Sequence, residues 1–157
     1  MLLALHGPVV VCGAAQAHAG GGLMKLLLIL AGLGQLALAL GSLALPRMLG
    51  WKEQTAKLRP LTRQMFWTYA SYIWVTNICF GVISTLTPGL LLDGAVITRL
   101  VCGYITCYWG ARLGIQFFYF DRTDAPNGWF YTLSEVGLVI LFAYLTGLYG
   151  WIALGLG

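Results

Sequence analysis

The sequence predicts an all-α integral membrane protein, a bundle of about four transmembrane helices joined by short loops. Of its 157 residues, 59% are hydrophobic and only 9% are charged, whereas soluble domains carry roughly 25% charged residues. Aromatic residues make up 13% and there are 21 glycines, a composition typical of transmembrane helices. A spanning helix needs about 20 apolar residues. We therefore expect one membrane domain over residues 23–157.

The first 22 residues do not fit this pattern. Their apolar run is broken by His6, Gly7 and Pro8, and it lacks the basic start of a signal peptide. The chain then restarts at Met24 and Lys25, which resembles an ordinary translation start. We interpret residues 1–22 as an N-terminal leader or extension, and we expect Met24 to be the native initiator.

Turn signals divide the rest of the chain into helices, which we predict at about residues 25–45, 64–86, 95–120 and 133–155. Pro46 ends the first helix, and a Thr-Pro-Gly turn at residues 87–89 ends the second. The turn DRTDAPNG separates the third helix from the fourth. Between the first two helices, the segment WKEQTAKLR can form a short helix at the lipid interface.

The loop at residues 46–63 determines the expected orientation. It carries five basic residues against a single Glu53: Arg47, Lys52, Lys57, Arg59 and Arg63. Short loops rich in Lys and Arg stay in the cytoplasm. We therefore expect an inner-membrane protein with residues 46–63 and 121–132 in the cytoplasm and both termini on the opposite side.

The net charge of +4 reflects this basic loop, a pattern of membrane orientation and not of nucleic-acid binding. We expect membrane lipid, and partner membrane subunits or further copies of this chain, as partners. The four cysteines form no C-x-x-C pair, and both histidines, His6 and His18, precede the predicted bundle. The sequence therefore predicts no metal site and no haem or other cofactor.

Two stripes of residues run along the predicted third helix. The first consists of small residues that favour close helix packing: Gly103, Cys107, Gly110 and Gly114. The second is polar and lies on the opposite side: Tyr108, Arg112, Gln116 and Tyr119. Two faces that avoid lipid predict a central position for this helix.

Arg112 is the most informative residue of the polar stripe. Counted from the cytoplasmic turn, it lies roughly 13 Å into the bilayer, where an unpaired charge costs at least ~2.5 kcal/mol. We predict that it faces the bundle interior beside one of three acids, Asp121, Asp124 or Glu135. Snorkelling toward water is the alternative. The second helix adds polar residues at the same membrane face, with Asn77 predicted at a similar depth to Tyr108: Tyr69, Tyr72, Thr76 and Asn77.

Glu135 has a second explanation. It completes the sequence TLSE, a capping box in which Thr132 and Glu135 would satisfy the first amides of the fourth helix. Capping and pairing with Arg112 both remain open at this point.

Two function classes follow from these features, although neither gives a biochemical activity. The first is a structural or accessory subunit of a membrane complex. The alternative is a lipid- or anion-binding membrane enzyme, in which Arg112 holds the anion and Gln116, Tyr108 and Tyr69 donate hydrogen bonds. Its general acid or base would be Glu135 or Asp121. A third class, ion or solute transport, is less favoured than these two, because the sequence shows no broken helices or internal repeats.

Overall fold

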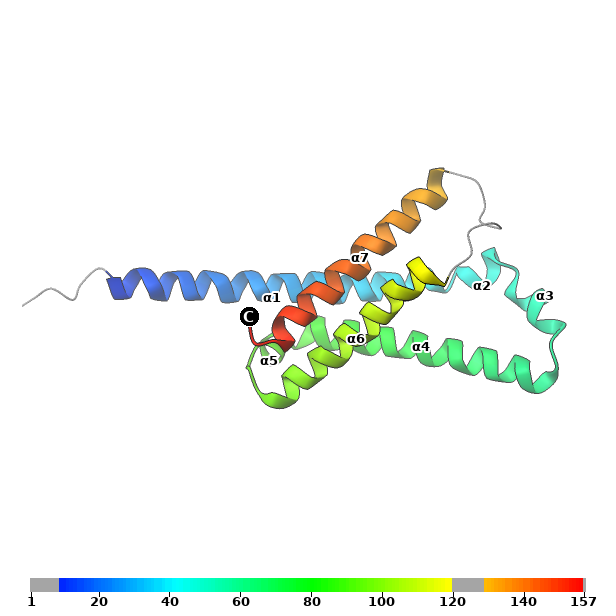
Figure 1. The fold of residues 1–157 in the computed structure, drawn as a ribbon, viewed down its shortest axis with the longest axis horizontal. Coiled ribbons are helices and arrows are strands. Elements are labelled where there is room, and N and C mark those ends of the chain that lie inside the picture. Colours follow the sequence, from blue (N-terminus) through cyan, green and yellow to red (C-terminus); the bar gives the residue numbers. More distant parts are fainter. Residues whose placement is uncertain (1–8, 120–128, 157) are drawn as a thin grey trace, which may run out of the picture.

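The computed structural model describes residues 9–119 and 129–156, and every regular element in these two ranges is a helix. Four are long and three are short (Figure 1). In chain order they are α1 (Val9–Ser42), α2 (Leu45–Met48), α3 (Trp51–Ala56), α4 (Pro60–Leu86), α5 (Pro88–Leu91), α6 (Val96–Phe118) and α7 (Trp129–Ala153). The predicted all-α class is confirmed.

The helix boundaries differ from the predicted ones where local signals are weak. α1 begins at Val9 and not near residue 25, because the stretch from Val9 to Ser42 contains no proline that could stop a helix. α4 begins at Pro60 and not at residue 64, since proline is well suited to the first helical position. The short helix predicted between the first two long helices corresponds to α3.

Three helical stretches are long and apolar enough to cross a membrane: Gly21–Met48, Pro60–Leu86 and Thr132–Ala153. α6 is not among them, although its 23 residues have the required length. Its sequence is too polar, because it contains Arg99, Arg112 and Gln116. Three of the four predicted spans therefore correspond to stretches of this kind, whereas the predicted third span corresponds to the more polar α6.

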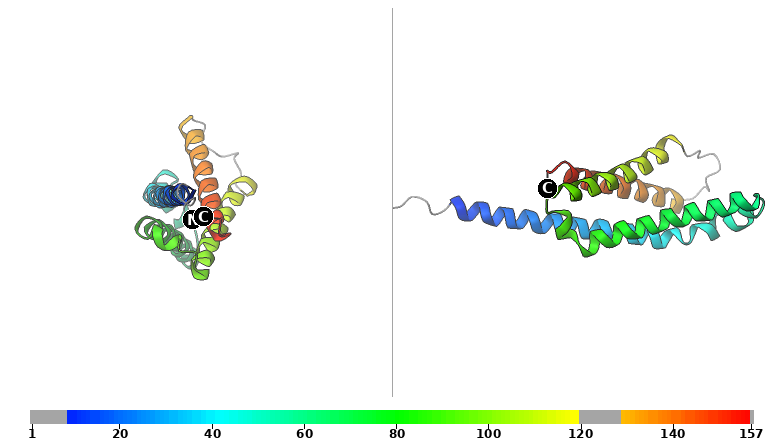
Figure 2. Two further views of the ribbon diagram at one scale, coloured as in Figure 1. Left: turned by 90° about the vertical axis from the view of Figure 1, so that its left-hand side faces the viewer. Right: turned by 90° about the horizontal axis from the view of Figure 1, so that it is seen from below.

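The long helices form two antiparallel hairpins. α1 packs along α4, and α6 packs along α7. Figure 2 shows the α6–α7 hairpin lying on one side of the α1–α4 hairpin, which gives two layers. The layers meet mainly through α1 and α7. At the end that carries α2 and α3 they splay apart (Figure 1).

Two buried glycines allow the closest approach between helices. A Cβ atom added to Gly32 of α1 would lie 2.3 Å from Thr85 Oγ1 and 2.7 Å from the carbonyl oxygen of Gly81. A Cβ atom added to Gly81 of α4 would lie 2.8 Å from Leu36 Cγ. Real side chains do not tolerate these distances, so the α1–α4 contact requires glycine on both sides.

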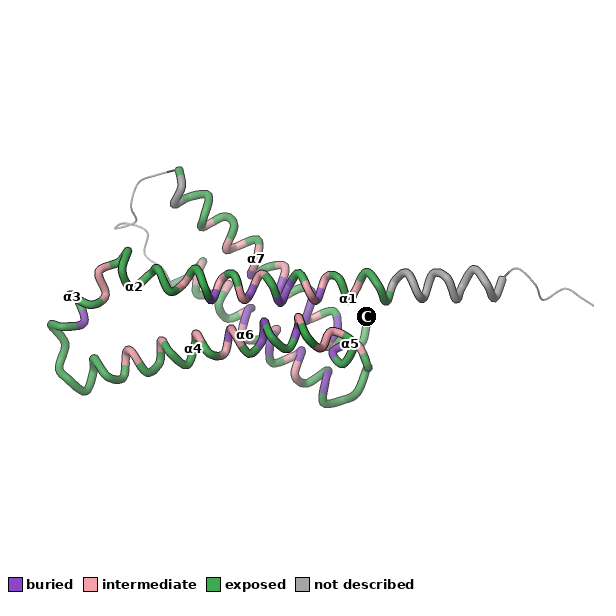
Figure 3. The backbone as a smooth tube through the Cα atoms, turned by 180° about the vertical axis from the view of Figure 1, so that it is seen from behind, coloured by how far each residue is buried: buried purple, intermediate pink, exposed green. Residues whose placement is uncertain are grey.

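The core occupies only the half of the bundle near α5 and the C-terminus (Figure 3). In the long helices its large side chains are Leu28, Phe80, Ile105, Trp109, Phe142, Leu145, Leu148, Tyr149 and Ile152. α4 has no buried residue before Asn77, and α6 has none after Trp109. The packing therefore ends part-way along both hairpins.

The charged side chain of Arg99 contacts the C-terminal end of α7. Its Nε donates to the carbonyl oxygen of Ala153 at 3.0 Å, at the last turn of α7. The guanidinium thereby satisfies a free carbonyl and lies at the negative end of the helix dipole. On α7, the Tyr144 hydroxyl donates to the carbonyl oxygen of Leu27 at 2.7 Å and ties α7 to α1.

The glycine contact predicts a clear difference between two alanine variants. Gly32→Ala should lower the stability of the folded protein by about 1–3 kcal/mol, because the added methyl group forces α1 and α4 apart. Gly114→Ala is the matched control, since nothing lies within 4 Å of the position its Cβ would take. It should be neutral, or stabilising by up to about 1 kcal/mol through helix propensity. Thermal unfolding in detergent, followed by circular dichroism, measures the stability of both variants. An equal change in stability would contradict the close contact between α1 and α4 at Gly32.

Candidate functional site: the polar mouth of the helix seam

The buried face of α6 continues into polar residues. Its buried positions are Thr98, Cys102, Ile105 and Trp109, alternately four and three residues apart. The same alternation next reaches Arg112 and Gln116, which therefore lie on the face that α6 turns to the core. Arg112 is nevertheless exposed, because the buried packing ends one turn earlier. We use the word seam for the line along which the helices pack in the core, and polar mouth for the polar, open end of that line. The polar mouth of the seam is defined as Asn77, Tyr108, Arg112, Gln116 and Glu135.

One hydrogen bond of the mouth joins α4 to α6. The hydroxyl of Tyr108 donates to Asn77 Oδ1 at 3.0 Å. The Tyr108 ring also packs edge-on against Phe80, with the ring centroids 5.3 Å apart. The structure thus brings together two residues that the sequence placed at a similar depth, at the first buried residue of α4.

A second polar contact joins α6 to α7. Gln116 Nε2 donates to Glu135 Oε1 at 3.4 Å, a long hydrogen bond. Both side chains are half-buried. Glu135 therefore faces α6, as the predicted cluster requires, but it meets the amide of Gln116.

Arg112 lies between these two contacts. Its guanidinium carbon sits 6.0 Å from the ring centroid of Phe142, near the limit for a cation–π interaction. Within the described residues its guanidinium forms no ion pair, with Glu135 or any other acid. Phe118, the end of α6, lies six positions further along the chain, so Arg112 lies roughly 9 Å from the helix end.

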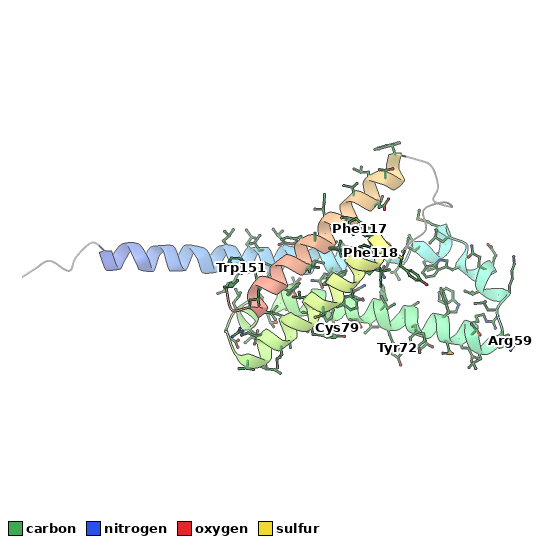
Figure 4. All side chains as sticks on the ribbon, viewed as in Figure 1. Arg59, Tyr72, Cys79, Phe117, Phe118 and Trp151 are labelled. Atoms are coloured by element: carbon green, nitrogen blue, oxygen red, sulfur yellow. The ribbon has the colours of Figure 1, made fainter. Side chains whose placement is uncertain are left out.

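The other predicted polar residues lie away from the mouth. Tyr69 and Tyr72 are 59% and 65% exposed, and Figure 4 shows Tyr72 on the outer side of α4. Tyr119 is 80% exposed just after α6. Asp121 and Asp124 lie outside the described residues. The capping box predicted for Thr132 is wrong, because α7 already begins at Trp129.

The predicted packing stripe on α6 contacts its neighbours unevenly. Cβ atoms added to Gly110 and Gly103 would lie 3.6 Å from Thr146 and 4.0 Å from Ala153, which is ordinary contact with α7. Cys107 is exposed, and Gly114 faces open space. The closest helix approach is instead at Gly32 and Gly81, outside the stripe.

Sequence reasoning missed a polar network in the core. Tyr149 of α7, Gln35 of α1 and Ser84 of α4 are all fully buried. Gln35 Nε2 donates to the Tyr149 hydroxyl at 2.8 Å, and Ser84 Oγ shares a hydrogen bond with that hydroxyl. Gln35 Nε2 also reaches the carbonyl oxygen of Ala31 at 3.2 Å, whereas its Oε1 has no partner among the described residues. The available signal was Gln35 itself, an amide within an otherwise apolar run.

The network consists of neutral donors and acceptors from three helices, so its physical effect is to hold those helices in register.

In the described ranges, no group of three His, Cys, Asp or Glu side chains is arranged to hold a metal ion. Comparison of the chain with protein families, with curated proteins and with solved structures gave no match.

The core network predicts coupling between Gln35 and Tyr149. Tyr149→Phe should destabilise the fold by about 1–3 kcal/mol, because two buried groups lose their partner. A double-mutant cycle with Gln35→Leu should give a coupling energy of about 0.5–2 kcal/mol. The control cycle pairs Gln35→Leu with Tyr144→Phe, whose hydroxyl bonds Leu27 instead, and it should be additive. Unfolding in detergent supplies the free energies, and additivity in both cycles would contradict the network.

Proposed function

We propose that this chain is a small multi-pass inner-membrane protein that serves as an accessory subunit of a membrane complex. In this proposal a partner segment covers the polar mouth of the seam. The observation that supports it is the exposure of Arg112 on the same face of α6 that forms the core. A helix face that is buried in the core along part of its length and is polar and exposed beyond it is typical of an interface completed by another chain.

The cost of leaving this face to lipid favours a protein partner. An arginine within a bilayer costs about 2.5–3.5 kcal/mol at the centre of a helix, and less near its end. Gln116 and Glu135 add further polar groups at the same place. A neighbouring helix that offers acceptors would remove this cost, since polar side chains hydrogen-bond across helices within membranes.

The residues of the mouth also indicate the kind of partner. Arg112 lies over the ring of Phe142, which in turn stacks on Trp109 with the ring centroids 5.2 Å apart. Arginine beside packed aromatic rings is common at the centre of protein interfaces. We therefore expect a partner helix that presents a carboxylate or carbonyl to Arg112. That helix belongs either to another subunit or to a second copy of this chain.

The proposed orientation rests on the charges at the two ends of the bundle. The segment from α2 to the start of α4 carries Arg47, Lys52, Lys57, Arg59 and Arg63 (Figure 4 labels Arg59). The α5 end carries Lys25 and Arg99 with Asp93. The stronger basic excess favours the α2–α3 end as the cytoplasmic end. Residues 121–132, the last of which belong to α7, would share that side.

The accessory role predicts that Arg112 carries binding energy. Arg112→Gln should reduce the fraction of assembled complex by about 5- to 30-fold, equivalent to about 1–2 kcal/mol. Arg59→Gln is the control, because it removes the same charge at the tip of the basic segment. Native mass spectrometry after mild detergent extraction measures the assembly. A monomeric native protein would contradict the accessory role, and loss of bound lipid without loss of a partner chain would favour the lipid- or anion-binding alternative.

The orientation predicts a labelling pattern in a background without native cysteines. Leu156→Cys, exposed near the C-terminus, should react with a membrane-impermeant maleimide added to intact cells. Leu58→Cys, exposed after α3, should react only after permeabilisation. Leu58 is preferable to Thr55, which is buried and donates to the carbonyl oxygen of Trp51. The reverse pattern would invert the proposed topology.

A further inference from the structure

A basic pocket lies between the α2–α3 segment and the first turns of α4. It has a volume of about 660 Å³, within the size range of ligand pockets. Its lining residues are Pro46, Arg47, Gly50, Lys52, Glu53, Thr55, Ala56, Arg63 and Trp67. No part of the polar mouth belongs to it, so the two sites are separate.

The pocket carries an excess of positive charge. Three bases, Arg47, Lys52 and Arg63, line it against one acid, Glu53. In the part of the chain that the structure describes, none of these three bases forms an ion pair. Their charges therefore remain available to an anion. Arginine suits phosphate in particular, because its planar guanidinium can make two parallel hydrogen bonds to phosphate oxygens.

The walls of the pocket are held in place by packing. Trp51 of α3 packs edge-on against Phe66 of α4 at 5.2 Å and against Trp67 at 6.4 Å between ring centroids. Thr55 is the buried residue of α3. Gly50 has φ 59° and turns the chain from α2 into α3, a conformation that favours glycine. These contacts fix α3 over α4 and so shape the space between them.

The position of the pocket indicates the source of the anion. Figure 1 shows α2, α3 and the start of α4 extending past the end of α6. Two helical stretches that could cross a membrane meet at this segment, Gly21–Met48 and Pro60–Leu86. Tryptophan is enriched at the headgroup level of membranes, where Trp51 and Trp67 would then lie. Lipid phosphates would be the most abundant anions at that level.

From these observations we infer that the pocket between α2–α3 and α4 binds the phosphate group of an anionic phospholipid. The inference depends on the proposed membrane location but not on the accessory role. Arg47 and Arg63 contact the phosphate oxygens, Lys52 adds charge, and Trp67 packs against the glycerol and upper acyl region. A soluble phosphate ester shares the phosphate chemistry but lacks the apolar part.

A matched pair of double variants tests the pocket. Lys52→Gln with Arg63→Gln removes two lining charges, whereas Lys57→Gln with Arg59→Gln removes the same two charges from neighbouring positions that do not line it. Each lost base should weaken binding about fivefold. We therefore expect about 25-fold weaker binding of phosphatidylglycerol for the first pair. The second pair should stay within about twofold of the native protein.

Native mass spectrometry of delipidated protein, titrated with phosphatidylglycerol in detergent micelles, gives these affinities. Phosphatidylcholine and inorganic phosphate are titrated in parallel. An equal loss of lipid affinity in both double variants would mean that binding depends only on the overall positive charge of the loop, and it would overturn the pocket. Binding of inorganic phosphate as tight as that of the lipid would overturn the lipid as occupant.

Single variants keep the test valid if the Lys52–Arg63 double variant fails to accumulate. Lys52→Gln and Arg63→Gln alone should each lose about fivefold in lipid affinity, and Lys57→Gln should lose none. The maleimide labelling pattern, measured on the same variants, separates the outcomes. A normal pattern with unchanged lipid binding counts against the pocket alone, whereas an altered pattern counts against the proposed topology.

Discussion

The hydroxyl of Tyr149 holds the two helical hairpins together within the buried core. It bonds Gln35 of α1 and Ser84 of α4, whereas each hairpin otherwise packs mainly within itself. Apolar contact alone gives little preference for one register between helices in lipid, because lipid tails are as apolar as leucine side chains. A buried polar contact does, since its donors and acceptors must meet in one arrangement. The position of α7 against the first hairpin therefore depends on this network.

The network lies in the same half of the bundle as the tight glycine contact between α1 and α4. Packing is thus concentrated toward α5, and the opposite ends of the hairpins diverge. This divergence exposes Arg112, although the residue follows the buried face of α6. The location of the core and the openness of the polar mouth are consequences of one packing arrangement.

Two chemically different features result at the diverging end. The polar mouth lies within the helices and has acceptors, an amide and one guanidinium backed by aromatic rings, a set suited to another helix. The basic pocket lies beyond the end of α6, and its three bases stand beside the apolar side chains of Pro46, Ala56 and Trp67, a set suited to a phosphate that carries an apolar group. The proposed protein contact and the proposed lipid contact would therefore use different residues.

The sequence by itself determined the helical class, the basic segment and the polar character of α6, because composition and turn residues act locally along the chain. It also placed Tyr108 and Asn77 at one level, and the structure joins them. Three features depended on the tertiary structure. The close approach of Gly32 and Gly81 and the burial of Gln35 beside Tyr149 need partners that are distant in sequence. The exposure of Arg112 depends on where the packing of other helices ends. Helical periodicity assigns a residue to a face of its helix, but only the neighbouring helices decide whether that face is covered.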